Sequence, residues 1–267
     1  MKIAFASFAA VAATLLSTAS WAAGPRDVSI ASVDGDHVAY RVLGNGQPAV
    51  VMISGLGDGM ESFRDVAPEI AKFATVILYD RAGYGGSDRS SRLRDAEASD
   101  RELSAVLAQS GIRGPYVVVG HSLGGLFAEY FAAKHPDQVS DLILEESRPV
   151  DFTRRCEAVK AGMCLPPAFA VRFMAKGAQD EFAARAATTE EIESVGAAKG
   201  PRVLVISRAI QAKASAFDAL WAQAQNDLAA RYPGSRHLLV KSSHYIHQDQ
   251  KEWFVSSVRA FLQRNGR

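Results

Sequence analysis

The chain has 267 residues, of which 48% are hydrophobic and 22% are charged, and its formal net charge is +1. This is the composition of an ordinary globular protein, and the length allows one large α/β domain with an insertion. The sequence has no basic run or stripe of the kind that nucleic-acid-binding proteins carry, so we expect no nucleic-acid partner.

Residues 1–22 are predicted to be a signal peptide. Lys2 is followed by an apolar run over 3–16, and the small residues Ser20 and Ala22 suit cleavage after Ala22. A membrane anchor is the alternative, but the run is shorter than the roughly 20 residues that span a bilayer. We therefore expect an exported protein, periplasmic or secreted, whose mature chain makes no stable membrane insertion.

Eight short runs predict strands, and the first two flank a turn at 34–36 that makes them an antiparallel hairpin. Several later runs are continuously apolar, as expected of strands buried on both faces. Helical segments separate the later strands, so we predict an α/β fold whose mostly parallel sheet has helices on both faces. In chain order, the predicted strands are 28–32, 38–42, 49–54, 75–80, 116–119, 141–146, 202–207 and 236–241.

Helical spacing is predicted over 58–73, from Leu123 to about Lys134, and in an amphipathic segment at 251–265. A further helix is predicted over 100–110, with Asp100 as its N-cap and Gly111 as its stop.

Residues 147–200 contain no strand-like run and are predicted to form a helical lid between strands six and seven. The core domain would then comprise 23–146 and 201–267. Within the lid, Thr188 followed by Glu191 predicts a helix start with a capping box. Cys156 and Cys164 predict a disulfide in an exported chain, with two free buried thiols as the alternative. No metal site is expected from two thiols without a nearby histidine.

The stretch GHSLG at 120–124 is a G-x-S-x-G pattern between a predicted strand and a predicted helix. Glycines allow a sharp turn that presents Ser122, whose hydroxyl needs a base to act as a nucleophile. Among six histidines, His244 and His247 directly follow the last strand, and His244 is the candidate base because it is nearer the strand end. His247 is interpreted as a surface or lid-contact residue.

Four segments, in order and spacing, resemble landmarks of α/β-hydrolase-fold serine hydrolases of the esterase and lipase type: SGLG at 54–57, YDRAGYGGS at 79–87, GHSLGG at 120–125 and SHYIH at 243–247. The resemblance covers roughly residues 28–265. It implies a Ser-acid-His triad and an oxyanion hole made by the backbone N–H groups of Leu56 and Leu123. It implies no cofactor.

The triad acid of such proteins commonly follows strand seven, but here no carboxylate follows that strand until Asp218, within a predicted helix. Some members of the family carry the acid after strand six, where this chain has Glu145 and Glu146. Adjacent strand residues point to opposite faces, so only one of the two reaches the histidine. The family pattern aligns best with Glu146, which we predict over Glu145, with Asp218 third.

The resemblance implies hydrolysis of a small-molecule carboxylic ester through an acyl-enzyme intermediate. An apolar lid stretch at 165–174 suggests an acyl pocket lined by Phe169, Phe173 and Met174, and the alternative is that these residues form the core of the lid. Hydrolysis of an amide, a peptide or a carbon–carbon bond, and perhydrolase activity, use the same triad. A non-catalytic binding protein on this scaffold is the alternative from another class.

Overall fold

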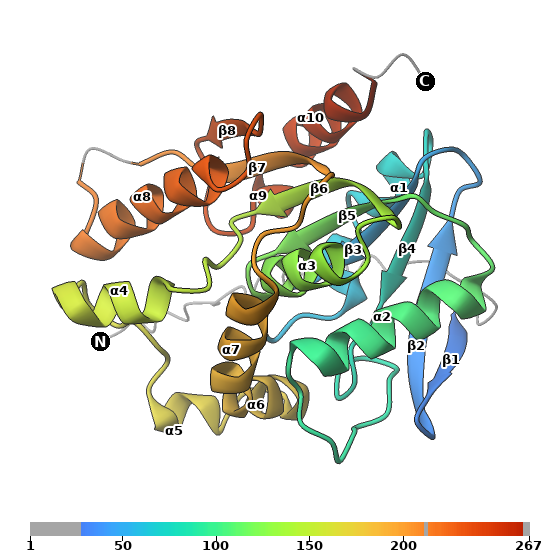
Figure 1. Cartoon of the computed structure of the whole chain (residues 1–267), viewed down its shortest axis with the longest axis horizontal. Helices are drawn as coiled ribbons and strands as arrows, with labels where there is room; N and C mark the ends of the chain where they lie inside the picture. The colour runs from blue at the N-terminus through green and yellow to red at the C-terminus, as the bar shows by residue number, and fades with distance from the viewer. Residues whose placement is uncertain (1–27, 211–212, 264–267) are drawn as a thin grey trace, which may run out of the picture.

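An eight-stranded sheet organises the computed structural model, which describes residues 28–210 and 213–263 (Figure 1). The strand order is β1-β2-β4-β3-β5-β6-β7-β8; β2 is antiparallel to both of its neighbours, whereas β3 to β8 are all parallel to one another. The predicted signal peptide, 1–22, lies outside the described residues.

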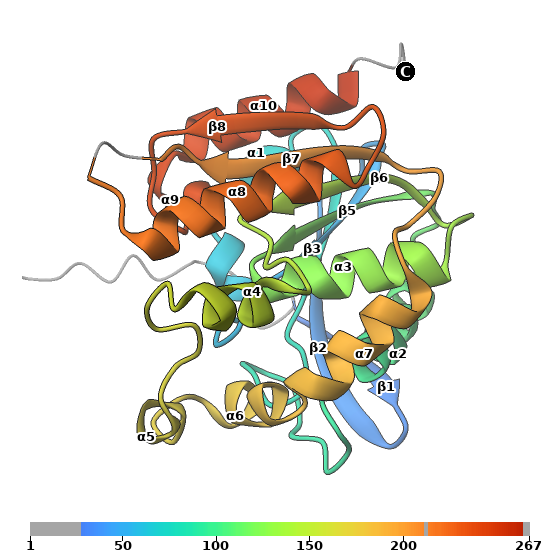
Figure 2. The same ribbon diagram turned by 60° about the vertical axis from the view of Figure 1, so that its left-hand side comes forward.

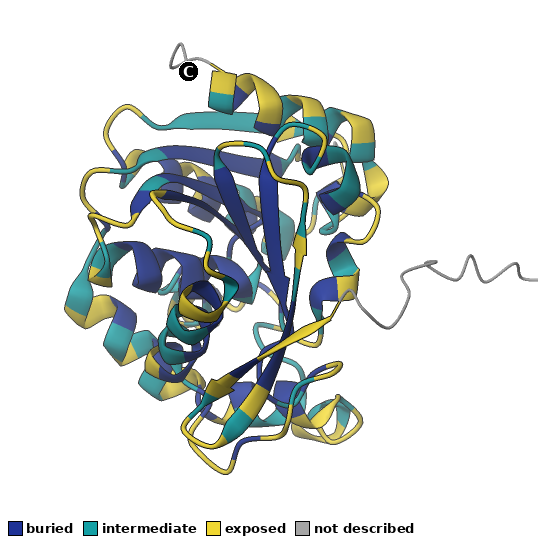
Figure 3. Ribbon diagram, turned by 90° about the vertical axis from the view of Figure 1, so that its right-hand side faces the viewer, coloured by how far each residue is buried: buried dark blue, intermediate teal, exposed yellow. Residues whose placement is uncertain are grey.

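The strands lie where the apolar runs predict them, with ends that differ by a few residues. β3, β4 and β5 are buried along their whole length, whereas β1 at the sheet edge is largely exposed (Figure 3). Their bounds are β1 Ser29–Val33, β2 Asp36–Leu43, β3 Ala49–Ile53, β4 Thr75–Tyr79, β5 Tyr116–His121, β6 Val139–Glu145, β7 Arg202–Arg208 and β8 Arg236–Val240.

Helices pack on both faces of the sheet, which explains the continuous apolar character of its central strands. The bounds are α1 Ala67–Ile70, α2 Ala96–Ser110, α3 Leu123–Lys134, α4 Phe152–Val159, α5 Ala168–Val171, α6 Lys176–Ala183, α7 Arg185–Val195, α8 Ala216–Ala230, α9 Ile246–Asp249 and α10 Lys251–Gln263, with a 3₁₀ turn η1 at Met60–Phe63. One apolar core lies between the sheet and α2, α3 and α8, and the other lies between the sheet and α1 and α10 (Figures 1 and 2).

The single helix predicted over 58–73 is wrong, because η1 and α1 are two short, separate elements. Pro68 lies in the first turn of α1. It has no N–H to donate to the carbonyl of Arg64, and its ring disfavours a helix that runs through it. A proline is tolerated in the first turn, so the helix begins anew around it.

Two predicted helix caps are also wrong. The N-cap of α2 is Asp95, whose side chain accepts the N–H of Ala98, because good helix formers extend the helix toward the N-terminus past Asp100. Asp100 lies inside α2, and its carboxylate contacts His135 Nε2 at 2.7 Å. Thr188 lies inside α7, three residues after the helix begins at Arg185, so it cannot be the N-cap.

Glu191, the other half of the predicted capping box, caps a different helix. Its carboxylate accepts the backbone N–H groups of Ala96 and Glu97 at 2.9 and 3.1 Å, at the start of α2. These amides have no acceptor within their own helix, so a carboxylate from α7 satisfies them and complements the helix dipole.

The segment between β6 and β7 is helical, with α4 to α7 and no strand among its residues, all of which are described. The predicted disulfide between Cys156 and Cys164 is present, with a Cα–Cα distance of 5.6 Å. It closes the turn after α4, and Cys156 packs with Phe152 of the same helix and Trp221 of α8. Among the described helices, none is both long and apolar enough to cross a bilayer.

Candidate active site

The turn between β5 and α3 presents Ser122 in a strained backbone conformation. Its φ is 53°, a value that residues other than glycine rarely adopt and that clusters at functional sites. The neighbouring glycines are needed because a Cβ on Gly120 would lie 2.6 Å from the Gly124 carbonyl oxygen. A Cβ on Gly124 would overlap the carbonyl oxygens of Ile53 and Ser54 at the end of β3. The sequence thus folds into a tight corner with a half-exposed serine at its tip.

Glu146 follows β6 and is fully buried, with a φ of 44°. Its Oε2 lies 3.1 Å from His244 Nδ1 and accepts the indole N–H of Trp221 at 3.0 Å. A carboxylate only accepts hydrogen bonds, so this contact assigns a proton to Nδ1 and leaves His244 Nε2 as a base. The structure therefore brings together the predicted acid and the predicted base.

Arg208, at the end of β7, completes the surroundings of the Glu146 carboxylate. Its backbone N–H donates to Oε1 at 2.8 Å, and its guanidinium forms an ion pair with Oε2. Asp218 does not reach His244: it lies in the first turn of α8, where it forms a capping box with Ser215 and an ion pair with Arg208 at 3.1 Å. Arg208 was not identified from the sequence. It could have been, because it ends β7 while Glu145 and Glu146 lie at the end of β6, the preceding strand, and a basic residue there predicts an ion pair with one of them.

Glu145, the other candidate acid, faces a different histidine. Its carboxylate oxygens each lie 2.9 Å from His247 Nδ1, and one accepts the His247 backbone N–H at 2.7 Å. Both side chains are fully buried, so the interpretation of His247 as a surface or lid-contact residue is wrong. Burial raises the pKa of Glu145, but its contacts with His247 outweigh burial and lower that pKa below its ordinary value.

His121 links the turn at Ser122 to the loop that carries His244, the predicted base. Its Nε2 lies 3.0 Å from the His244 carbonyl oxygen, and its ring centroid lies 4.9 Å from that of His244. Burial lowers the pKa of His121 to about 4, so the ring is neutral near pH 7 and its Nε2–H donates to that carbonyl. No hydrogen bond joins the Ser122 hydroxyl to His244 among the described side chains, and in free enzymes this bond is often long.

One buried cluster has the donor types of a metal site. Donor atoms of His121, Glu145 and His247 lie within 4.8 Å of one another. Both ring nitrogens of His247 are already engaged, Nδ1 by Glu145 and Nε2 by Ser62 Oγ at 3.0 Å. A metal would have to break these contacts, so the arrangement fits a hydrogen-bonded network that fixes the loop after β8.

The predicted oxyanion-hole residues border the serine. Leu123 is the first residue of α3, and the first amides of a helix have no acceptor within it. Neither the Leu123 nor the Leu56 amide donates to another described residue. Gly55 brings its loop against Ser122, because a Cβ there would lie 3.3 Å from Ser122 Cβ. Both amides thus have no other acceptor among the described residues, and their role in stabilising a developing negative charge stays a prediction.

A buried ion pair holds the oxyanion loop, residues 54–57, which contains the predicted oxyanion-hole residue Leu56. The same ion pair connects this loop to the lid. The Arg81 guanidinium donates to the carbonyl oxygens of Ser54 and Gly55 at 2.7 and 2.9 Å. Glu181 of α6 accepts from Arg81 Nε at 2.6 Å and from the Tyr84 hydroxyl at 2.6 Å. Burial lowers the pKa of Arg81, but the charge of Glu181 outweighs burial and raises that pKa above its ordinary value.

The predicted acyl-pocket residues lie on or near α5. Phe169 is 69% exposed and Phe173 is 88% exposed, while Met174 is half-buried. The alternative that these residues form the core of the lid is therefore wrong for the two phenylalanines. Contact of the three with a substrate stays a prediction.

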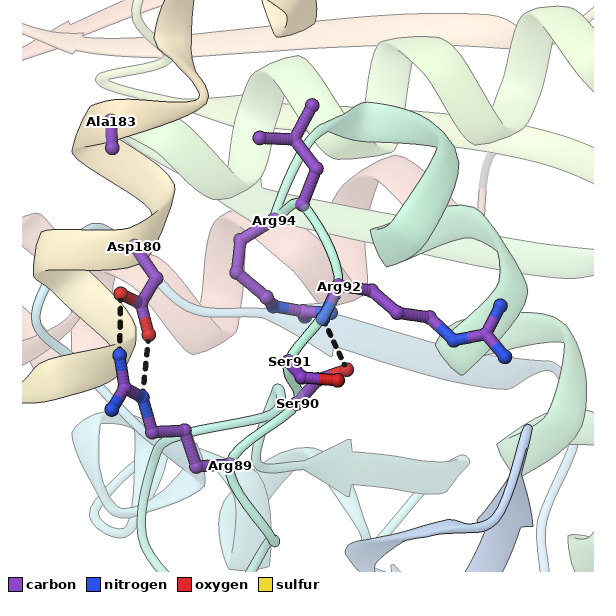
Figure 4. A pocket seen from close by; sticks show the side chains of 8 residues that line it. Arg89, Ser90, Ser91, Arg92, Arg94, Asp180 and Ala183 are labelled. Carbon is purple, nitrogen blue, oxygen red and sulfur yellow. Dashed lines mark hydrogen bonds and ion pairs between the residues drawn. The ribbon is translucent and has the colours of Figure 1, made fainter.

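A groove of about 550 Å³ lies apart from these residues, between the loop before α2 and helix α6 (Figure 4). The charge of each of its arginines is already neutralised. Arg89 forms a bidentate ion pair with Asp180. Arg92 forms an ion pair with Asp34, and Arg94 forms one with Glu102. The groove therefore offers no free cation to an anionic ligand. Its lining residues are Arg89, Ser90, Ser91, Arg92, Leu93, Arg94, Asp180 and Ala183.

The family model of the alpha/beta hydrolase fold matches residues 48–191, more than half of the chain and including Ser122 and Glu146. The chain belongs to the α/β-hydrolase-fold family. The chain is 39% identical over 109 residues to a pimeloyl-[acyl-carrier protein] methyl ester esterase of Chromobacterium violaceum, a match that covers 41% of this chain and 40% of that esterase. The chain spans less than half of the length of the first curated relatives it matches.

Solved structures share the fold of the chain over most of its length. A thermophilic esterase from Thermogutta terrifontis superimposes with a TM-score of 0.69 at 18% identity, covering 89% of this chain and 98% of that one. The enol-lactonase from Burkholderia xenovorans gives 0.62 at 19% identity, covering 88% and 100%. At such low identity the likeness establishes the fold alone.

Proposed function

We propose that the hydrolase cleaves carboxylic esters with a Ser122–His244–Glu146 triad, through an acyl-enzyme intermediate. The observation that carries the proposal is the 3.1 Å contact between His244 Nδ1 and a fully buried Glu146, beside a serine held at a positive φ. A carboxylate in this position orients the imidazole and stabilises the imidazolium that forms during catalysis.

In the first half of the reaction, His244 Nε2 accepts the proton of the Ser122 hydroxyl while Oγ attacks the ester carbonyl carbon. The carbonyl oxygen becomes an oxyanion that the amides of Leu56 and Leu123 stabilise, each by about 3 kcal/mol. The intermediate collapses when its bond to the alkoxide breaks, and His244 gives its proton to the leaving alcohol.

In the second half, His244 takes a proton from water, and the resulting hydroxide attacks the acyl carbon. The bond to Ser122 Oγ then breaks, the serine regains its proton from His244, and a carboxylic acid leaves. Protein groups supply every proton transfer in this sequence, so we expect the reaction to need no cofactor.

The name of one curated relative favours an ester over the other bonds that this triad cleaves. That relative, 39% identical over 109 residues, is a pimeloyl-[acyl-carrier protein] methyl ester esterase. Amide, peptide or carbon–carbon bond hydrolysis and perhydrolysis remain the alternatives, and a binding protein without activity is the alternative from another class.

A panel of nitrophenyl esters from acetate to palmitate tests the proposal and reports the acyl length that the site accepts. We expect Ser122→Ala and Glu146→Gln to lose most of the wild-type rate. Glu145→Gln is the matched control, because it removes a charge from the neighbouring carboxylate without touching His244. Full activity in Glu146→Gln together with loss in Glu145→Gln would show that Glu145 is the triad acid.

We also propose that the hydrolase acts after export, in the periplasm or outside the cell. The pattern of residues 1–22 supports this, and the disulfide between Cys156 and Cys164 agrees with an oxidising compartment. N-terminal sequencing of the purified cellular protein tests it: a start at Ala23 is expected, and a cytoplasmic protein that begins at Met1 would contradict it.

A further inference from the structure

The outer part of the lid, residues 159–176, exposes several large apolar side chains. Val159 is 63% exposed, Met163 70%, Phe169 69% and Phe173 88%. Helix α5, in the middle of this segment, lies at the edge of the molecule away from the sheet (Figure 2). Four exposed large apolar side chains thus fall in one short segment, whereas single scattered exposed apolar residues are ordinary.

The same segment carries charge of one sign. Between Ala158 and Gln179 the charged residues are Lys160, Arg172 and Lys176, and all three are exposed. No carboxylate of the described residues lies within 4.0 Å of their side-chain nitrogens, and Lys176 Nζ instead donates to Gln179 Oε1 at 3.1 Å. The segment therefore joins unneutralised positive charge to exposed apolar side chains.

We propose that residues 159–176 dock the hydrolase onto an anionic lipid surface. Apolar side chains such as Phe169 and Phe173 enter the boundary between headgroups and acyl chains, while the cations attract the anionic headgroups. Each Lys or Arg near such a surface strengthens binding about five-fold, so the three cations together contribute about two orders of magnitude.

Charge argues against a second copy of the chain as the occupant. A two-fold symmetric contact places the same patch on both subunits, so the positive charge of Lys160, Arg172 and Lys176 would face a patch of the same sign. The disulfide favours a rigid surface, because it closes the turn that carries Met163 and so limits the ordering needed on binding. This docking is independent of the proposed ester chemistry.

Vesicle co-sedimentation tests the proposal with the chain from residue 23 onward, which contains all described residues and lacks the predicted signal peptide. Vesicles of phosphatidylcholine alone are compared with vesicles of equal parts phosphatidylcholine and phosphatidylglycerol. We expect binding to the anionic vesicles only, weakened by salt. Phe173→Ser should weaken it about ten-fold, and Lys160→Gln or Arg172→Gln about five-fold each.

Leu239→Ser and Lys199→Gln are matched controls, since both residues are exposed and lie outside residues 159–176. Both should bind as wild type does. The proposal is wrong if the two vesicle types bind equally, if the lid variants bind as tightly as the controls, or if wild type binds neither vesicle. In the last case a protein partner becomes the better candidate for this surface.

Discussion

Replacing Glu181 with leucine tests the connection between the lid and the oxyanion loop. Glu181 and Arg81 are each only 1% exposed, and the carboxylate accepts two hydrogen bonds from the guanidinium and one from Tyr84. Glu181→Leu keeps a similar volume but leaves a buried cation without its counter-charge.

Removing one partner of a buried ion pair typically costs about 3–5 kcal/mol. Arg81 keeps its hydrogen bonds to the carbonyl oxygens of Ser54 and Gly55, so we expect the lower end of that range, about 3 kcal/mol. Because those carbonyls belong to the oxyanion loop, we also expect kcat for ester hydrolysis to fall in Glu181→Leu.

Urea denaturation measures the loss as a lower transition midpoint with an unchanged m-value. The double variant Arg81→Met/Glu181→Leu removes both charges, so it should be destabilised by less than the sum of the two single variants. A loss below about 1 kcal/mol in Glu181→Leu, or strict additivity in the double variant, would refute a buried ion pair at this place.

Three further predictions concern stability. In wild type, the free energy of unfolding should fall as the pH is lowered from 6.5 to 4.5, because His121 becomes protonated in the unfolded chain but stays neutral in the folded protein, where its pKa is about 4. Over the whole interval between the two pKa values the loss is about 3 kcal/mol. His121→Asn should make the free energy of unfolding less dependent on pH in this range. Gly124→Ala should cost at least about 1–3 kcal/mol, since its methyl group would overlap two carbonyl oxygens of the β3 end. Reducing the disulfide of Cys156 and Cys164, eight residues apart, should cost about 2.5 kcal/mol through loop entropy. Denaturation curves measure each of these.

Each of these predictions has a control and an outcome against it. An unchanged pH slope in His121→Asn would assign the slope to another group. For Gly124→Ala the control is Gly111→Ala, where the new methyl group meets no atom and only the φ of 70° is unfavourable, so equal costs would contradict the overlap argument. Equal stability with and without reductant would mean that the bridge constrains little.

The strands could be predicted from sequence because a parallel strand that is buried on both faces consists almost entirely of apolar residues. The ends of the helices were harder to predict, since several nearby residues are suitable N-caps for the same helix. Asp95 and Asp100 are equally good caps by residue type, and the preference for Asp95 depends on helix formers between them. Glu191 caps α2 from nearly a hundred residues away, a pairing that no local pattern contains.

Some contacts of the candidate site could likewise be predicted from the sequence, and others could not. Adjacent residues at a strand end point to opposite faces, and this simple rule separates Glu146, beside His244, from Glu145, beside His247. The roles of these residues in catalysis remain predictions. Trp221 could not be assigned to the site in advance, because its indole N–H reaches Glu146 through the tertiary packing of α8 against β7 and the lid.

The most direct test of the account is labelling of the folded protein with a fluorophosphonate, followed by peptide mapping. An activated serine next to an oxyanion hole attacks this probe, whereas an ordinary surface hydroxyl does not. We predict one adduct, on the peptide that contains Ser122, which disappears in Ser122→Ala and forms much more slowly in His244→Ala. A folded wild-type protein that stays unlabelled at Ser122 would contradict the central claim that the turn after β5 presents a catalytic nucleophile.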